Sequence, residues 1–155
     1  MLLKELKSIF VKYNIDGYIV PKNDEHFSEY SKNNRLKKIS NFTGSAGFAL
    51  ILKKINYLFV DGRYTIQSVK ESGKFFKIIE IPHTSMRDIL DKYKDLVIGY
   101  DPKIFTSKFL KENIPNECRL NPLDVNLIDV ISKNKEEKVS QFYYLSEKIT
   151  GENTV

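Results

Sequence analysis

The sequence predicts an α/β domain in which helices flank a mixed β-sheet. Short apolar, β-branched runs alternate along the chain with segments of helical periodicity, which is typical of this class. The 155 residues are 41% hydrophobic and 29% charged, enough apolar material for one core. Two complete domains would leave each half near the lower size limit for a stable core. We therefore expect one main domain.

The helices are assigned from apolar spacing and from residues that cap or stop a helix. An amphipathic helix is expected first, over residues 2–13, because its apolar side chains recur at helical spacing. Asp24 is a candidate N-cap for a second helix over 24–32. The remaining helices are expected at 63–72, 84–93 and 106–113.

The strands are assigned from short apolar runs that glycine, proline or asparagine bounds. The runs 48–52 and 57–60 are separated by a short polar connection and predict a hairpin. The full set of expected strands is 17–20, 48–52, 57–60, 75–81, 96–100 and 118–120.

The pattern changes near the C-terminus. Residues 133–138, KNKEEK, are wholly polar, and the segment 142–149 is amphipathic again. This predicts one domain over residues 1–132, followed over 133–155 by a linker and the truncated start of a second domain.

Composition also bounds location and partners. Apolar runs such as 48–52 are far shorter than the ~20 residues needed to cross a bilayer, so no membrane partner is expected. The charged N-terminal segment is unlike a signal peptide, and the single cysteine, Cys118, cannot form an internal disulfide. We therefore expect a cytoplasmic protein. The net charge of +5 comes from 21 Lys and only 4 Arg, dispersed rather than clustered, which disfavours nucleic acid as a partner.

Few side chains fit catalytic or metal-binding patterns. His26 and His83 lie far apart and lack a second ligand at helical spacing, so no metal site is expected. Ser28 and Ser45 lack a nucleophile-elbow context. Cys118, near a predicted strand, fits a packing role better than a catalytic one.

The segment 44–47, Gly-Ser-Ala-Gly, precedes a strand rather than a helix. It therefore lacks the phosphate-binding geometry of a P-loop or a dinucleotide-binding turn. A tight turn, in which glycine supplies a positive φ or allows close backbone approach, is the better interpretation.

The tetrad Asp61-Gly62-Arg63-Tyr64 places a guanidinium at the end of a predicted strand. The five donors of Arg63 suit a carboxylate or a peptide carbonyl of a ligand. The same group could instead form a structural bridge with Asp61 or a neighbouring acid. Chemistry alone leaves both interpretations open.

Several short sequence blocks together resemble a known family. In order they are 24–30 (DEHFSEY), 35–36 (RL), 39–47 (ISNFTGSAG), 61–64 (DGRY) with Gln67, 99–102 (GYDP) and 126–129 (NLID). Their order and spacing resemble the N-terminal domain of aminopeptidase P, the Xaa-Pro aminopeptidase of the creatinase/prolidase superfamily. Two positions depart from the pattern: Asn41 stands where glycine is expected, and Phe59 where tryptophan is common.

The resemblance implies a creatinase/prolidase N-terminal domain, ribonuclease H-like, with no catalytic residue and no metal ligand in this chain. It implies that Arg63 contacts substrate, with His26, Asp61 and Tyr64 as secondary candidates. Two divalent metal ions, manganese being expected, would lie in a catalytic domain of the parent enzyme that this chain lacks. The chain alone is therefore expected to be inactive.

The function implied is that of a non-catalytic domain in a metal-dependent Xaa-Pro aminopeptidase. It would shape substrate access and subunit contacts in a homo-oligomer that removes the residue before a proline, so its partners would be peptides with proline at the second position. The alternative is a stand-alone peptide-binding or protein-binding module with the same fold.

Overall fold

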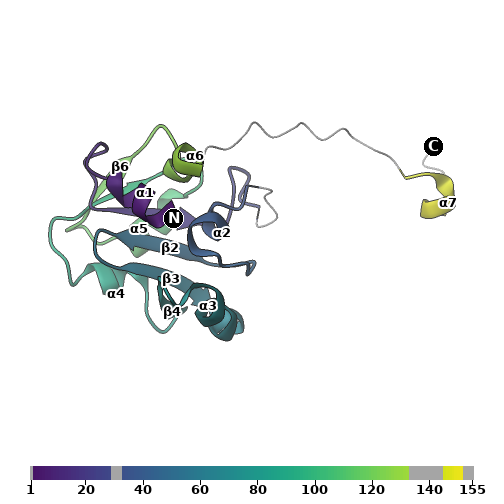
Figure 1. Ribbon diagram of the computed structural model, residues 1–155, viewed down its shortest axis with the longest axis horizontal. Helices are drawn as coiled ribbons and strands as arrows, with labels where there is room; N and C mark the ends of the chain where they lie inside the picture. Colours follow the sequence, from purple (N-terminus) through teal and green to yellow (C-terminus); the bar gives the residue numbers. More distant parts are fainter. Residues whose placement is uncertain (1, 29–32, 133–144, 152–155) are drawn as a thin grey trace.

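The computed structural model describes residues 2–28, 33–132 and 145–151, which form a six-stranded sheet flanked by helices (Figure 1). The strand order is β4-β3-β2-β1-β5-β6. The strands are β1 (Gly17–Pro21), β2 (Phe48–Leu52), β3 (Asn56–Asp61), β4 (Lys77–Ile81), β5 (Val97–Tyr100) and β6 (Arg119–Pro122). β2 pairs antiparallel with β1 and β3, whereas the other neighbours pair parallel. The expected mixed α/β sheet is confirmed.

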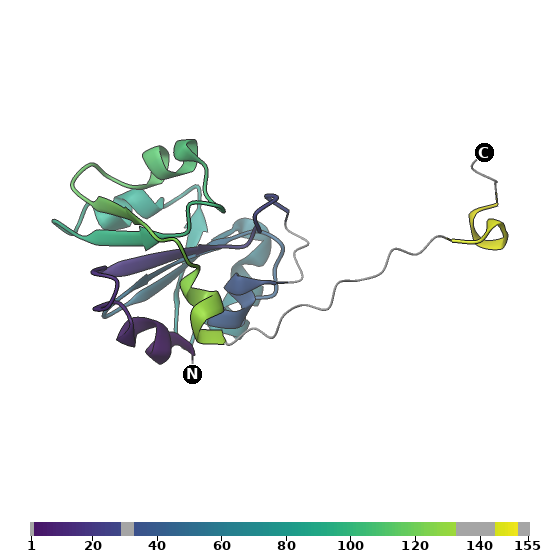
Figure 2. The ribbon, with the colours of Figure 1, turned by 90° about the horizontal axis from the view of Figure 1, so that it is seen from above.

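Helices cover both faces of this sheet (Figure 2). α1 (Leu2–Ser8), α2 (Arg35–Ser40) and α6 (Leu127–Ser132) pack together on one face, and α4 (Met86–Leu90) and α5 (Ser107–Asn113) on the other. A short 3₁₀ turn, η1 (Gly62–Tyr64), leads from β3 into α3 (Thr65–Ser72), which packs along β3 and β4. The last described helix is α7 (Glu147–Thr150).

Two apolar clusters fill the space between the helices and the sheet. Because successive side chains of a strand point to opposite faces, neighbouring residues of one strand enter different clusters. Leu58 packs with Leu6 and Leu36 on the first face, whereas Phe59 packs with Leu50 and Met86 on the second. Burial on both faces explains why the central strands are continuous apolar runs.

The helix expected over 24–32 is absent from the described residues of that range, and residues 29–32 lie outside the description. Asp24 instead closes a tight turn: its Oδ1 accepts the backbone N–H groups of His26 and Ser28, each at 2.9 Å. Phe27 has a φ of 58°, which a right-handed helix cannot include. The candidate N-cap therefore serves a turn of the kind aspartate favours outside helices.

The first helix is shorter than the expected 2–13. Regular α-helix ends at Ser8, and i→i+3 bonds, such as Phe10 N–H to the Lys7 carbonyl at 3.3 Å, tighten the chain that follows. Asn14, with a φ of 51°, completes the stop.

Two short helices, α2 and α6, were not expected from the sequence. α2 has the signals of a real helix: the Asn34 side chain accepts the Lys37 N–H at 2.9 Å, and Asn41 ends it with a φ of 68°. This left-handed backbone explains the departure at position 41, because glycine adopts it most readily and asparagine tolerates it. The other elements differ from expectation only at their ends.

The glycines of the turn before β2 stand where side chains do not fit. A Cβ on Gly47 would lie 2.8 Å from the carbonyl oxygen of Phe59, and its φ is +150°. A Cβ on Gly44 would collide with the ring of Phe42. The expected close approach is thus present at both glycines. Gly47 lies against the backbone of β3, and Gly44 lies against the buried ring of Phe42.

We predict that Gly44→Val and Gly47→Val each lower the free energy of unfolding by about 1 to 3 kcal/mol, because each forces backbone or ring displacement. Urea denaturation midpoints measure the effect. Ala46→Val, in the same turn but with a Cβ already present, is the matched control and should change the midpoint less. Unchanged midpoints for both glycine variants would contradict the packing described here.

Candidate functional site

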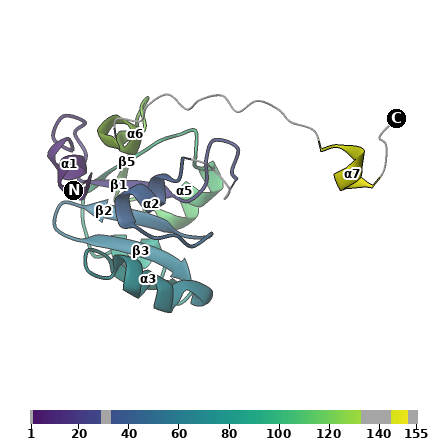
Figure 3. The same cartoon turned by 45° about the vertical axis from the view of Figure 1, so that its right-hand side comes forward.

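The family-like sequence blocks meet at one edge of the sheet, which we call the carboxyl edge. Five parallel strands end there and β2 begins there, on the side toward which β3 points in Figure 3. The turn before β2, the 3₁₀ turn after β3 and the segments after β1, β5 and β6 therefore lie around the same edge. In open α/β sheets, ligands bind outside the carboxyl ends of the strands.

Arg63 and Asp61 form an ion pair at this edge. Arg63 Nε and Nη2 donate to the two oxygens of Asp61 at 3.1 and 2.7 Å, and the Arg63 backbone N–H donates to Asp61 Oδ1 at 2.9 Å. The Arg63 hydrogen bond holds the pKa of the Asp61 carboxyl below its ordinary value. The Arg63 side chain is nevertheless 70% exposed. The bridge with Asp61 is thus present, and the guanidinium also faces solvent.

Tyr64 joins the turn before β2 to the same structure. Its hydroxyl lies 2.8 Å from Ser45 Oγ, its ring meets the ring of Phe42 edge to face, and the Arg63 guanidinium lies 5.1 Å from its ring centroid. The sequence-predicted residues Asp61, Arg63 and Tyr64 and the Ser45 turn therefore form one cluster.

A polar bridge beside this cluster fixes the turn against α3. The Glu71 carboxylate accepts from the backbone N–H and the hydroxyl of Thr43 at 2.8 and 2.7 Å, and Gln67 Nε2 donates to Thr43 Oγ1 at 2.7 Å. Gln67, one of the family-like residues, thus helps to hold the turn in place.

His26 stands apart from the Arg63 cluster. It belongs to the tight turn after β1, where its backbone N–H donates to Asp24. His83 is also separate, 3.7 Å from Glu80 and 77% exposed. Cys118 is buried in the second apolar cluster, and burial raises the pKa of its thiol, which disfavours the reactive thiolate.

A buried arginine ties the turn after β1 to α2 and α6. Arg35, with its side chain only 8% exposed, donates from Nε and Nη2 to Asp129 at 2.7 to 3.1 Å and from Nη2 to Glu25 at 2.7 Å. Burial tends to raise the pKa of the Asp129 carboxyl, but hydrogen bonds from Arg35 and Asn33 outweigh it, so the pKa lies below its ordinary value. The two carboxylates offset the cost of burying one guanidinium.

The blocks 99–102 and 126–129 also meet through buried polar contacts. Asn126 Nδ2 donates to Asp101 Oδ2 at 2.9 Å, and the Leu127 N–H donates to the Tyr18 hydroxyl at 3.3 Å. These contacts link the end of β5 and the first half of β1 to the start of α6. The polar residues Asp101 and Asn126 of the family-like blocks thus position segments around the carboxyl edge.

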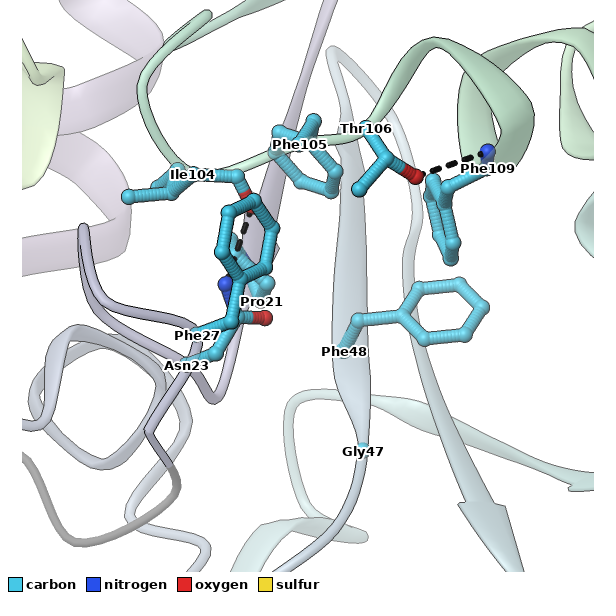
Figure 4. A pocket seen from close by; sticks show the side chains of 9 residues that line it. All are labelled: Pro21, Asn23, Phe27, Gly47, Phe48, Ile104, Phe105, Thr106 and Phe109. Atoms are coloured by element: carbon cyan, nitrogen blue, oxygen red, sulfur yellow. Dashed lines mark hydrogen bonds between the residues drawn. The ribbon is translucent and has the colours of Figure 1, made fainter.

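The carboxyl edge also has a pocket of about 160 Å³ that the sequence analysis missed (Figure 4). Its rings come from three separate segments: Phe48 points toward Phe109, and Phe27 lies on the other side, beside Ile104 and Phe105. The remaining lining residues are Pro21, Asn23, Gly47 and Thr106. Isolated phenylalanines in unrelated segments give no spacing signal, so only the folded chain brings them together.

Within residues 2–28, 33–132 and 145–151, no three His, Cys, Asp or Glu side chains gather closely enough to hold a metal ion. Among the helices in this part of the chain, none combines the length and apolar character that a membrane span requires.

Residues 3–131 match the family described as creatinase/prolidase N-terminal domain. The chain is also 34% identical over 164 residues to a probable Xaa-Pro aminopeptidase P from Coprinopsis cinerea, an alignment that covers 97% of this chain and 26% of that protein. A second fungal relative, from Laccaria bicolor and of the same description, is 31% identical with the same coverage. The chain thus spans about a quarter of these relatives.

Solved structures show the same fold. The X-prolyl aminopeptidase from Caenorhabditis elegans, described as a cytosolic enzyme with a di-nuclear active site, superposes with a TM-score of 0.75 at 24% identity, over 87% of this chain and 26% of that one. The N-terminal domain of the cytoplasmic peptidase PepQ from Mycobacterium tuberculosis gives a TM-score of 0.64 at 15% identity, over 83% and 96%. The architecture defines an N-terminal domain of the creatinase/prolidase type. The chain belongs to the creatinase/prolidase N-terminal domain family.

We predict that Asp129→Asn lowers the free energy of unfolding at neutral pH by about 1 to 3 kcal/mol, the range for a charge-assisted hydrogen bond. Because the pKa of Asp129 is lowered on folding, its contribution is fully present above the unfolded value of about 4. It is lost as the pH falls through that value toward the lower pKa of the folded state. The variant should therefore lose less stability on acidification than the wild type.

Urea unfolding at a series of pH values measures both effects. Asp124→Asn, an exposed acid before the same helix, is the control and should leave the stability unchanged at neutral pH. If the difference in free energy of unfolding between the wild type and Asp129→Asn is the same at neutral and acidic pH, the role assigned to this carboxylate is wrong.

Proposed function

We propose that this chain is the N-terminal domain of a metal-dependent Xaa-Pro aminopeptidase, called here the parent enzyme, and that it shapes substrate access and subunit contacts without performing chemistry. The observation behind the proposal is the membership of residues 3–131 in the family, together with relatives that bear the Xaa-Pro aminopeptidase description. Residues 1–132 would form this domain, and 133–155 a linker and the start of the next. The parent enzyme would be cytoplasmic and homo-oligomeric.

The physical task of such a domain follows from the bond to be cleaved. Proline has no backbone N–H group and its φ angle is fixed. The enzyme must therefore recognise the conformation of the peptide backbone, because the usual N–H hydrogen bond is missing. A wall beside the reacting centre can admit the end of a chain and exclude its middle. The carboxyl edge, with its ion pair and its pocket, is the surface proposed for that wall.

The metal ions belong elsewhere in the parent enzyme. The C. elegans relative is described as having a di-nuclear active site, whereas the described residues of this chain do not fit such a centre. Two divalent ions, manganese being expected, would supply activated water there. This chain's own contribution would come from Arg63, which presents a planar fork to a peptide carbonyl or carboxylate. Asp61 and Tyr64 would orient that fork, and His26 would act through the turn after β1.

We predict that the 155-residue chain alone does not hydrolyse a Xaa-Pro peptide, even with added manganese, because its described residues offer no cluster of ligands that could hold a metal ion and activate water. Hydrolysis is measured as release of the N-terminal residue, which is detected by chromatography. The parent enzyme under the same conditions is the positive control. If hydrolysis of the peptide copurifies with the 155-residue chain and is lost when a chelator is added, the proposal is wrong.

We further predict that Arg63→Ala in the parent enzyme lowers kcat/KM by about tenfold to a hundredfold while the metal content stays the same. Enclosure by another domain removes competing water, and a charge-assisted hydrogen bond of about 1.5 to 3 kcal/mol would then be lost. Arg63→Lys should restore activity only partly, because lysine keeps the charge but loses the planar fork.

The control for this series is the melting temperature. An exposed ion pair contributes about 0 to 1 kcal/mol, so Arg63→Ala should leave the melting temperature nearly unchanged. If kcat/KM stays intact and the melting temperature falls instead, Arg63 is a structural bridge to Asp61 and not a substrate contact.

A further inference from the structure

The pocket at the carboxyl edge, called here the aromatic pocket, is mostly apolar, and none of the described residues that line it is charged. Four of its nine lining residues are phenylalanines, and the polar ones, Asn23 and Thr106, have internal partners. Asn23 Nδ2 donates to the Ile104 carbonyl at 3.0 Å, and Thr106 Oγ1 accepts the Phe109 N–H at 3.1 Å. The lining therefore favours an uncharged apolar group, because most of the surface that such a group would contact offers no hydrogen-bond partner.

Phe27 lies at the rim of the pocket with an unfavourable backbone conformation. Its φ of 58° is rare for a bulky residue, and its side chain is still 55% exposed, so the strain is not matched by burial within this domain. The turn enforces the position: the Phe27 N–H donates to the Asp24 carbonyl at 3.0 Å, and Asp24 Oδ1 accepts from both neighbours of Phe27. Backbone strain that the surroundings maintain is typical of ligand clamps.

The rings that line the pocket pack closely on one another and on the core. The Phe48 ring stacks on Phe59 with centroids 4.6 Å apart and meets Phe109 edge to face at 5.3 Å, while Phe105 is tilted against Phe109 at 5.3 Å. Gly47, at the entrance to β2, contributes backbone to the lining of the pocket. Such a preformed apolar surface needs little rearrangement to accept a side chain.

The aromatic pocket lies on the face of the sheet to which Asp61, the partner of Arg63, points. Phe59 and Asp61 are two residues apart on β3 and so point to one face, and Phe48 is the β2 partner of Phe59. Neighbouring strands lie ~4.8 Å apart, and an extended peptide advances ~3.3 Å per residue. A peptide bound at Arg63 can thus place a side chain in the pocket within about three residues.

We propose that the aromatic pocket is a specificity subsite that receives an uncharged apolar side chain of a peptide lying along the carboxyl edge. The proposal rests on the proposed function in that the ligand is a peptide. It goes further because it assigns a side-chain preference to this domain, two or three residues along the peptide from the group that Arg63 contacts. Polar or charged side chains at that place would be disfavoured.

The test uses the 155-residue chain and two peptides, Ala-Pro-Leu-Ala and Ala-Pro-Ser-Ala, titrated into ¹⁵N-labelled protein while amide shifts are followed. We expect shifts at Gly47, Phe48 and Thr106, with an affinity at least fivefold higher for the leucine peptide. Phe27→Asn removes the ring but suits the left-handed turn, and it should abolish that preference. Val11→Asn, which replaces an exposed apolar residue far from the pocket, is the control and should leave the preference intact.

Equal affinity for the two peptides, no binding of either, shifts confined to other surfaces, or an unchanged preference in Phe27→Asn would each overturn the proposal. Remote amide shifts report whether a variant has kept its fold. Because binding is measured without catalysis, the pocket can fail while Arg63→Ala still lowers kcat/KM in the parent enzyme. Conversely, peptide binding by the chain together with an unaffected kcat/KM in Arg63→Ala would reject the part of the proposed function that makes Arg63 a substrate contact, and would retain the pocket.

Discussion

The direction of β2 is the constraint on which the carboxyl edge depends. β2 pairs antiparallel on both sides, with Phe48 opposite Pro21 of β1 and Phe59 of β3. This pairing brings the turn that precedes β2 to the same edge as the strand ends that surround it. A parallel β2 would place that turn at the opposite edge, away from Arg63, and would require crossover connections in place of the short turn to β3. Gly47 permits the arrangement, because a Cβ at this position would lie only 2.8 Å from the Phe59 carbonyl oxygen.

Buried polar contacts then fix the segments that surround this edge. Arg35, Asp129 and Glu25 join the turn after β1, α2 and α6, while Asn126 and Asp101 join α6 to the end of β5. In a low-dielectric interior, a polar group that loses its partner costs more than the bond contributes. The contacts therefore favour one arrangement of loops over alternatives with similar apolar burial. This explains why family-like blocks that are far apart in the sequence are found in the same chain: their polar residues contact one another in the fold.

The sequence was informative where local chemistry decides structure and silent where distant residues must meet. Apolar runs located the strands, and Thr106 and Ser85 cap helices close to their expected starts. The helix expected at Asp24 was wrong because the same carboxylate can cap a turn, and the positive φ of Phe27 decided between the two. The Arg63 pairing with Asp61 was one of two interpretations that remained open. The aromatic pocket had no linear signature, since its rings come from β2, α5 and the turns beside them.

The two interpretations of Arg63 are physically compatible. Asp61 binds one side of the guanidinium, Nε and Nη2, and the Tyr64 ring lies against the group, so the plane of the fork is set before any ligand arrives. Orienting a long side chain in advance reduces the conformational entropy lost on binding. In the exposed state, solvent screens the guanidinium and the ion pair contributes little stability. If another domain encloses the edge, the same geometry acts in a lower dielectric and its electrostatic effect increases. The ion pair with Asp61 is then the means by which Arg63 is positioned, and not a competitor to substrate contact.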